Sequence, residues 1–200
     1  MANVVDKITE KADAVFWLMK DSTLPPVIKI NGSALSSAMG ASLATKRTTA
    51  ERLVNGVDKD ALVIEPYANP FRVYSLEKDF YKFKQLFDNG VDCYVLNTGS
   101  FMGKDIDKNI TLSIIENIVE GKTKFEQWGN ISDISIMKIE GYIADFANND
   151  YRQEFMEKWQ NRIDFVKTCV ECNSGINILP QESLDALEKV LNELKQLQNN

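Results

Sequence analysis

Short apolar runs bounded by polar turns predict the strands of this chain. Ala14–Met19 and Val91–Leu96 are apolar and rich in β-prone residues, and each is closed by polar, turn-forming positions. Leu62–Ile64 predicts a shorter strand, and the isoleucines at 134, 136 and 139 suggest another. Leu24–Val27 holds two adjacent prolines, which predicts an extended turn or a sheet edge.

Helices are predicted where apolar residues recur every three or four positions. Asn89-Gly90 and Gly121 end two of them, Asn149 or Asp150 caps the third, and Pro180 opens the last. Ser33–Ala44 predicts a further short helix of small residues. The periodic sets are Leu76, Phe80, Phe83 and Phe87; Ile110, Ile114 and Ile118; Tyr151, Phe155, Trp159, Ile163, Val166 and Val170; and Leu184, Leu187, Leu191 and Leu194.

The alternation of strands and helices predicts an α/β fold, with a mixed sheet and flanking helices. The chain has 200 residues, of which 44% are hydrophobic, and this suits one domain with a real core. We expect residues 1–178 to form that domain. Residues 179–200 are expected to form an amphipathic helix packed on it, which is favoured over a partner-binding or coiled-coil helix. The phenylalanines at 80, 83 and 87 are expected to pack against a central strand 91–96.

Charge and composition narrow the classes of function. The net charge of −6 argues against broad binding of nucleic acid. The acidic N-terminal stretch is unlike a signal peptide, and no apolar run could cross a bilayer, so a cytoplasmic protein without a membrane partner is expected. The sequence has no histidine, which excludes Ser-His-Asp and Cys-His catalysis within it. Its three cysteines predict neither a disulfide framework nor a metal site.

The turn that follows strand 91–96 is the first candidate site. Asn97-Thr98-Gly99 ends the strand, Gly103-Lys104 follows, and a helix pattern opens near Thr111. In open α/β sheets, ligands bind outside the carboxyl ends of the strands, where loop and helix N–H groups can hold an anion. Thr98, Gly99, Gly103 and Lys104 are therefore candidate ligand-binding residues, although a plain connecting loop has the same spacing.

Three other motifs have a structural and a functional interpretation. Lys46 and Arg47 could hold a phosphate or carboxylate, or could lie in a solvated loop. Gly121-Lys122-Thr123 lacks the earlier glycine of a phosphate loop, so a helix end with an exposed lysine is favoured. Cys169 and Cys172 form a single CxxC at the end of a predicted helix, where structural cysteines are favoured over a redox pair.

Several segments, in order, resemble the ATP-dependent phosphoenolpyruvate carboxykinases. Tyr94–Gly99 (YVLNTG) resembles the family's YLVNTG, and Gly103–Ile115 aligns without a gap with its GKRISIKDTRAII. Leu24–Val27 resembles its LPPV, and the segment 37–47 resembles its TAKLAGTER. Weaker similarity extends the match to about residues 12–167. The resemblance is that of a distant branch, and of the C-terminal portion of the family's fold.

The resemblance implies a lobe that binds ATP. The adenine pocket of the family uses an arginine, the next isoleucine and a later threonine, and these fall on Asp105, Ile106 and Thr111. The isoleucine and threonine are kept, whereas aspartate replaces the arginine. The family's phosphate loop, metal ligands and oxaloacetate-binding arginine precede the matched region. The resemblance therefore implies that a divalent metal would come with the missing N-terminal part of a parent protein.

Two functional hypotheses stay open at this point. In the first, the chain is the nucleotide-binding lobe of a carboxykinase-like enzyme that interconverts oxaloacetate and phosphoenolpyruvate, or performs a related phosphoryl transfer, and is inactive alone. In the second, it is a degenerate, non-catalytic domain that binds another ligand or a partner. Asp105 favours the second hypothesis, and Ile106 and Thr111 favour the first.

Overall fold

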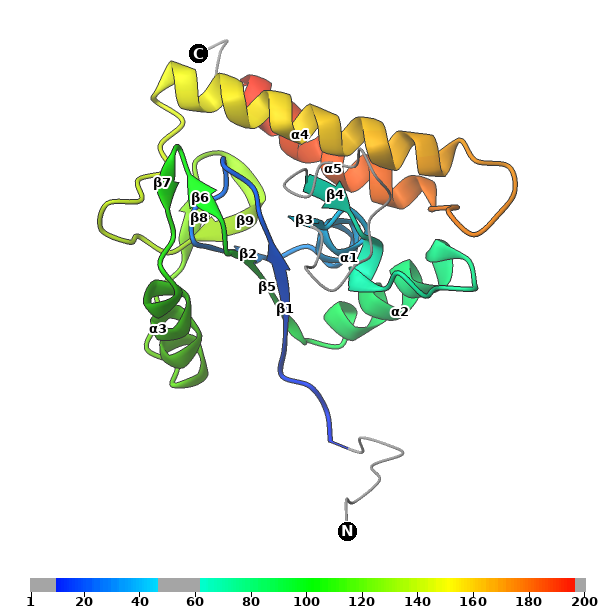
Figure 1. The fold of residues 1–200 in the computed structure, drawn as a ribbon, viewed down its shortest axis with the longest axis horizontal. Coiled ribbons are helices and arrows are strands. Elements are labelled where there is room, and N and C mark those ends of the chain that lie inside the picture. Colours follow the sequence, from blue (N-terminus) through cyan, green and yellow to red (C-terminus); the bar gives the residue numbers. More distant parts are fainter. Residues whose placement is uncertain (1–9, 47–61, 197–200) are drawn as a thin grey trace, which may run out of the picture.

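A five-stranded mixed sheet forms the centre of the molecule (Figure 1). The computed structural model describes residues 10–46 and 62–196. The strand order is β1-β5-β2-β9-β8, in which β1 and β5 are parallel and the other neighbours are antiparallel. The strands are β1 (Ala14–Met19), β2 (Val27–Ile30), β5 (Asp92–Asn97), β8 (Glu126–Trp128) and β9 (Ile131–Ile136). The predicted α/β class, with a mixed sheet and flanking helices, is confirmed.

Two of the predicted segments need correction. The extended turn or edge expected at Leu24–Val27 is wrong at its end, because Val27 begins β2, an interior strand between β5 and β9. The two prolines lie just before the first ladder position, so neither interrupts the sheet. The strand expected around Ile139 ends at Ile136, and Ile139 instead makes an isolated bridge with Tyr142.

Two further sheets have two strands each. β3 (Ala44–Lys46) pairs with β4 (Leu62–Ile64), the short strand that was predicted. β6 (Ser100–Phe101) pairs with β7 (Lys104–Asp105), in the segment where the sequence predicted only a loop. Met102 and Gly103 join β6 to β7 with φ of 48° and 78°, the left-handed conformation that two-residue hairpin turns require.

Helices cover both faces of the sheet. They are α1 (Ser33–Ala41), α2 (Leu76–Asp88), α3 (Lys108–Val119), α4 (Asn149–Val170) and α5 (Gln181–Gln196), with a 3-10 turn η1 at Pro66–Ala68. Alternate residues of a strand face opposite sides, and β5 shows this clearly. Cys93 and Val95 join the larger core with α1, α2, α4 and α5, whereas Tyr94 and Leu96 join a smaller one with α3.

Helix α1 lies very close to the sheet, and this requires small residues in the helix. A Cβ on Gly40 would lie 2.6 Å from the Trp17 ring, so glycine lets α1 pack tightly on the sheet. The phenylalanines of α2 pack beside it as expected. Phe80 is fully buried, Phe87 is nearly so, and the partly buried Phe83 ring lies 4.8 Å from that of Trp17.

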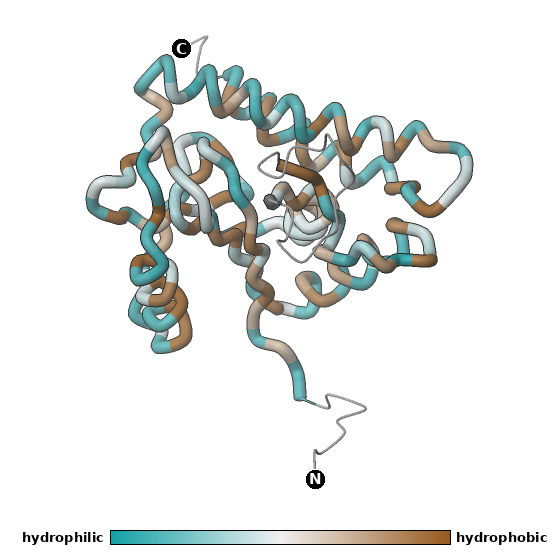
Figure 2. Tube along the Cα trace, in the orientation of Figure 1, coloured by the Kyte–Doolittle hydropathy of each residue, from teal (hydrophilic) through white to brown (hydrophobic). Residues whose placement is uncertain are grey.

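The last two helices complete the larger core. The cap of α4 is Asn148, which accepts a hydrogen bond from the Tyr151 N–H, rather than the expected Asn149 or Asp150. Helix α5 lies against α4, α1 and β9 with its leucine stripe buried. Figure 2 shows the corresponding alternation of hydrophilic and hydrophobic residues along α5. No helix in residues 10–46 and 62–196 is long and apolar enough to cross a membrane.

Candidate functional site

A cleft of about 960 Å³ opens at the carboxyl ends of the parallel strands β1 and β5. The strands end in register, with Met19 opposite Asn97. Residues 20–22 and 98–100, which follow them, line one side of the cleft. β3, β4, β7, the start of α3 and one face of α4 complete it. This is the sheet edge at which α/β proteins bind ligands.

The side chain of Asn97 connects the turn that follows β1 with the turn that follows β5. Its side chain is fully buried, and Nδ2 donates to the carbonyls of Asp21, Leu24 and Ser100 at 2.6, 2.7 and 2.9 Å. Its Oδ1 accepts the Gly99 N–H at 3.0 Å. One amide thus satisfies backbone groups of both turns, which fixes their relative position.

Gly99 lies close to the turn that follows β1. A Cβ at this position would lie 3.3 Å from both Cβ and Cγ of Lys20. A larger residue would require the Lys20 side chain to shift by a few tenths of an ångström. The predicted site residues Thr98 and Gly99 therefore line the cleft on a rigid edge.

A buried ion pair joins this edge to α4. Arg162 Nη2 lies 3.2 Å from Asp21 Oδ2, and Nη1 donates to the carbonyl and hydroxyl oxygens of Ser42 at 2.6 and 2.9 Å. Burial lowers the pKa of Arg162, and the Asp21 carboxylate opposes that shift. Nε of Arg162 is buried and has no hydrogen-bond partner among the described residues. Arg162 lines the cleft with one donor unused.

The β6–β7 hairpin directs some of the predicted site residues into the cleft and others away from it. Asp105 is exposed and lines the cleft, and so does Ile106, which is buried and donates its N–H to the Gly99 carbonyl at 2.9 Å. Lys104 is directed elsewhere: its Nζ donates to the Gly141 carbonyl at 3.2 Å and lies 4.2 Å from the centre of the Tyr142 ring. Gly103 makes the turn and does not line the cleft.

The first turn of α3 is occupied by its own cap. Asp107 Oδ1 accepts the Asn109 N–H at 2.7 Å, so the N–H group expected to hold an anion already bonds a carboxylate. Thr111 is half-buried in the next turn and is not among the residues that line the cleft. An anion at the start of α3 would therefore have to bind N–H groups other than that of Asn109.

The anion-binding candidates of the TKR segment are only partly described. Lys46 ends β3, where it pairs with Leu62, and its side chain is not described. Arg47 lies outside the described residues. Ala44, two positions before Lys46, lines the cleft.

The basic residues that line one side of the cleft were not predicted from the sequence. Lys20, Lys158 and Arg162 line it, and neither lysine makes an ion pair within the described residues. A signal was present: Arg162 interrupts the apolar face of α4 between Trp159 and Val166, and Lys158 lies four positions before it on the same face. A charged residue within an apolar stripe indicates a buried ion with a partner.

Two other candidate motifs lie at the ends of helices. Gly121 closes α3 with φ of 67°, and the Lys122 N–H bonds the Asn117 carbonyl, as expected of a helix end. Cys169 is buried and Cys172 is exposed beyond the end of α4. Within the described residues, no group of three or more acidic or cysteine side chains is placed to hold a metal.

Comparison with known proteins does not assign this chain to a family. Neither a scan against models of protein families nor a search among curated proteins found a match to this chain.

Proposed function

We propose that this chain is the nucleotide-binding C-terminal lobe of a phosphoenolpyruvate carboxykinase-like protein. The observation that supports this most directly is the composition of the cleft. Thr98 and Gly99 lie in one segment that resembles the carboxykinases, and Asp105 and Ile106 lie in another. All four residues line the same cavity. That cavity lies at the sheet edge where the fold class binds ligands.

The chemistry of the cleft suits a nucleotide. Ile106, Leu62 and Ile64 give it an apolar part, and the two β4 residues are substantially exposed there. Lys20 and Lys158 supply positive charge for phosphate oxygens. Asp105 and Asp107 repel phosphates, so the phosphates should lie on the side of β1 and α4.

We infer binding without turnover by this chain. In the resembled family, phosphoryl transfer uses a phosphate loop and a metal to neutralise the developing charge, and this sequence has neither a phosphate-loop motif nor a histidine. Interconversion of oxaloacetate and phosphoenolpyruvate, with a divalent metal, would belong to the whole parent. The purified chain should neither decarboxylate oxaloacetate nor hydrolyse ATP.

The test is a titration with ATP followed by amide NMR. We expect saturable shifts at Gly99, Ser100 and Ile106, with affinity in the millimolar range, about 4 kcal/mol. Asp105→Arg should strengthen binding by about 0.5–2 kcal/mol, because it removes a repelling charge and adds a cation that can stack on the base.

Matched variants locate the ligand. Lys158→Glu should weaken binding, whereas Lys167→Glu, on the same helix but outside the cleft, should not. Thr111→Val tests the adenine contact implied by the resemblance. If ATP leaves the cleft amides unmoved in the wild type and in Asp105→Arg at high millimolar concentration, the nucleotide proposal fails.

The second candidate is a degenerate binding module, and Asp105 favours it. A carboxylate now stands where the family has an arginine, and Asp107 adds another at the same cleft. Such an arrangement suits a cationic ligand. Spermidine, titrated in the same way, should shift Asp105 and Asp107 under this hypothesis, and Asp105→Arg should then abolish binding rather than strengthen it.

A further inference from the structure

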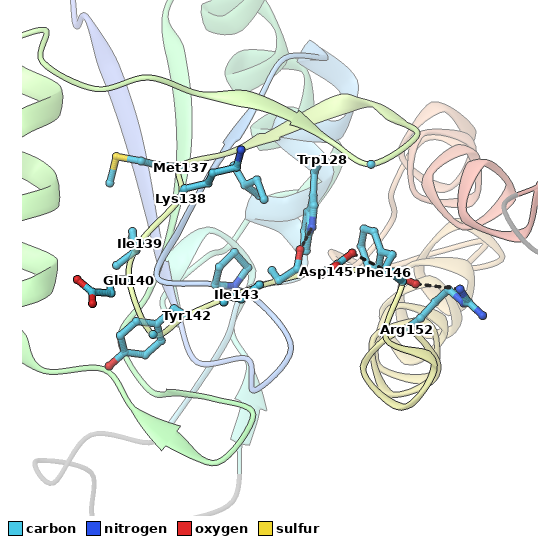
Figure 3. A pocket seen from close by; sticks show the side chains of 16 residues that line it. Trp128, Met137, Lys138, Ile139, Glu140, Tyr142, Ile143, Asp145, Phe146 and Arg152 are labelled. Carbon is cyan, nitrogen blue, oxygen red and sulfur yellow. Dashed lines mark hydrogen bonds between the residues drawn. The ribbon is translucent and has the colours of Figure 1, made fainter.

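Helix α4 begins beside a second cavity, of about 840 Å³ (Figure 3). The Trp128 and Phe146 rings that line it are buried and stacked on each other, with their centres 4.8 Å apart, so they belong to the core. Arg152 Nη1 donates to the Phe146 carbonyl at 2.8 Å, and this bond fixes the first turn of the helix to that core. Two cysteines lie at the opposite end of α4.

These two cysteines differ in exposure. Cys169 is in the last turn of α4 and is 5% exposed, whereas Cys172 follows the helix and is exposed to solvent. The sequence favours structural cysteines at this CxxC, and burial in the core agrees with that for Cys169. Free cysteine is among the most buried residue types, so the exposure of Cys172 needs another explanation.

The backbone between the two cysteines is helical. Val170 is the last residue of α4, and Glu171, which follows it, has φ of −75° and ψ of −8°, in the right-handed helical region. The rise and rotation of an α-helix place Cα atoms three positions apart at a distance of about 5 Å. Disulfides bridge Cα atoms that are about 4.4–6.8 Å apart. Cys169 and Cys172 can therefore be joined with little movement of the chain.

Joining them requires the exposed thiol to turn inward. Cβ atoms three positions apart on a helix are about 5–6 Å apart, and a disulfide needs about 3.5–4.5 Å. Cys169 is held in place, because its side chain is part of the larger core and its carbonyl accepts the Leu179 N–H at 3.2 Å. Since Cys172 lies past the last helical residue, closure of the pair moves Cys172 rather than Cys169.

An arginine acts on this pair through its charge. Burial raises the pKa of the Cys169 thiol, and the positive charge of Arg72 opposes that shift. The two Nη atoms of Arg72 donate to the Ile176 carbonyl and to Asn177 Oδ1, each at 2.8 Å, and so hold the loop that follows Cys172. Arg72 Nε is buried and has no hydrogen-bond partner among the described residues. The guanidinium favours the thiolate form of Cys169, which is the form that attacks a disulfide.

We propose that Cys169 and Cys172 form a reversible disulfide by exchange with a low-molecular-weight disulfide such as oxidised glutathione. The Cys172 thiolate attacks one sulfur of oxidised glutathione, which forms a mixed disulfide and releases one reduced glutathione. The Cys169 thiolate then attacks the Cys172 sulfur and releases the second. The protein thiols lose two electrons and two protons, and oxidised glutathione takes up both as it becomes two reduced molecules.

The two steps should differ in rate. Cys172 is exposed, so glutathione reaches it in the folded protein. Cys169 is buried and burial raises the pKa of its thiol, so the second step is the slower one. The product ties the last turn of α4 to the start of the loop that leads to α5. This site lies apart from the residues that line the cleft and does not depend on the nucleotide proposal.

Mass spectrometry of the whole chain tests both steps. The reduced protein is incubated with excess oxidised glutathione at pH 8, and samples are quenched with acid. We expect the wild type to carry one glutathione transiently and then to end two hydrogen atoms lighter than the reduced chain, with two reduced glutathiones released per chain. Proteolytic mapping should place the disulfide between Cys169 and Cys172, and dithiothreitol should restore the reduced mass.

Variants of single cysteines separate the roles. Cys169→Ser should stop at the mixed disulfide, keep one glutathione on Cys172, and release one reduced glutathione rather than two. Cys172→Ser should not react in the folded protein. Cys93→Ala is the matched control and should behave as the wild type, because Cys93 is 1% exposed. Circular dichroism checks that each variant is folded, and the wild-type masses decide the outcome for any variant that is not.

Three results with the wild type would overturn the proposal. They are a glutathione that stays on the chain however long the incubation, a mass that does not change, and a disulfide that maps to Cys93. A covalent dimer through Cys172 would also overturn it, because the exposed thiol would then serve a contact between copies. An intramolecular disulfide forms at a rate that does not depend on protein concentration, which distinguishes it from that dimer.

Discussion

Arg162 and Asp21 form an ion pair at 3.2 Å with side chains only 6% and 10% exposed, and it joins α4 to the end of β1. The two charges do not stand alone. Arg162 also bonds Ser42, and Asp21 Oδ1 accepts the N–H and hydroxyl of Thr23 at 3.0 and 2.7 Å. The pair is the centre of a buried network that supports the floor of the cleft.

Removing one partner should cost much more than removing both. Asp21→Asn leaves the Arg162 charge buried without compensation, and we expect a loss of about 3–5 kcal/mol in the free energy of unfolding. Adding Arg162→Met to that variant removes the uncompensated charge and should recover part of the loss. Urea unfolding followed by circular dichroism measures both. A double variant less stable than Asp21→Asn alone would show that Arg162 stabilises the protein by packing rather than by its charge.

The phenylalanines of α2 should differ according to their burial. Phe80 is fully buried, so Phe80→Ala should cost about 3–5 kcal/mol. Phe83 is only partly buried, stacked 4.9 Å from the Tyr67 ring, and Phe83→Ala should cost less, about 1–3 kcal/mol. Phe71 is 87% exposed, and its alanine variant is the control that should leave stability unchanged. A greater loss from Phe83→Ala than from Phe80→Ala would contradict the assigned helix face.

Stability should fall at alkaline pH. Burial raises the pKa of the Cys93 thiol to about 12, and burial likewise raises the pKa of the Tyr67 hydroxyl. Because the folded pKa exceeds the unfolded one, the contribution of Cys93 is complete below about pH 8.5 and is lost as pH rises toward 12. Between pH 8.5 and 10.5 we expect a loss on the order of 1–2 kcal/mol from Cys93, measured by urea unfolding. Cys93→Ala should show a shallower decline, and an equal decline in both proteins would exclude this source.

Thiol reactivity should separate the three cysteines. Cys172 is exposed, whereas Cys93 and Cys169 are buried, and burial raises the pKa of the Cys169 thiol. We expect one fast-reacting thiol in the native protein and three after unfolding, measured with a chromogenic disulfide reagent at pH 8. Cys172→Ser should remove the fast phase. Two fast thiols in the native protein would instead indicate that the end of α4 opens readily.

Long periodic segments were predictable from the sequence because their pattern encodes their burial. β1 was predicted with its observed ends, and the apolar stripes of α2 and α5 face the core as expected. β2 was missed because its four residues follow two prolines, and its place is decided by pairing with β5 and β9 far along the chain. The cap of α4 was misplaced because three adjacent polar residues, 148–150, can each act as a cap, and backbone conformation chooses among them.

The candidate site could be predicted only in part. The turn after β5 is local to one segment, so Thr98 and Gly99 were found from spacing. Lys20 and Lys158 come from distant segments, and only the folded chain brings them to the same cleft. The two-residue strands β6 and β7 carry too little periodicity to be recognised, although their hairpin decides that Asp105 lines the cleft and Lys104 does not.

The pairing of β1 with β5 has a consequence for the route by which this protein folds. Ala14 pairs with Asp92, so the sheet cannot form this ladder until residues far apart along the chain have met. Closing so long a loop costs entropy before any ladder bond repays it, and such topologies fold slowly. The helices can form early, whereas the edge that carries the cleft is completed late. Destabilising changes at Asn97 should therefore speed unfolding more than they slow folding.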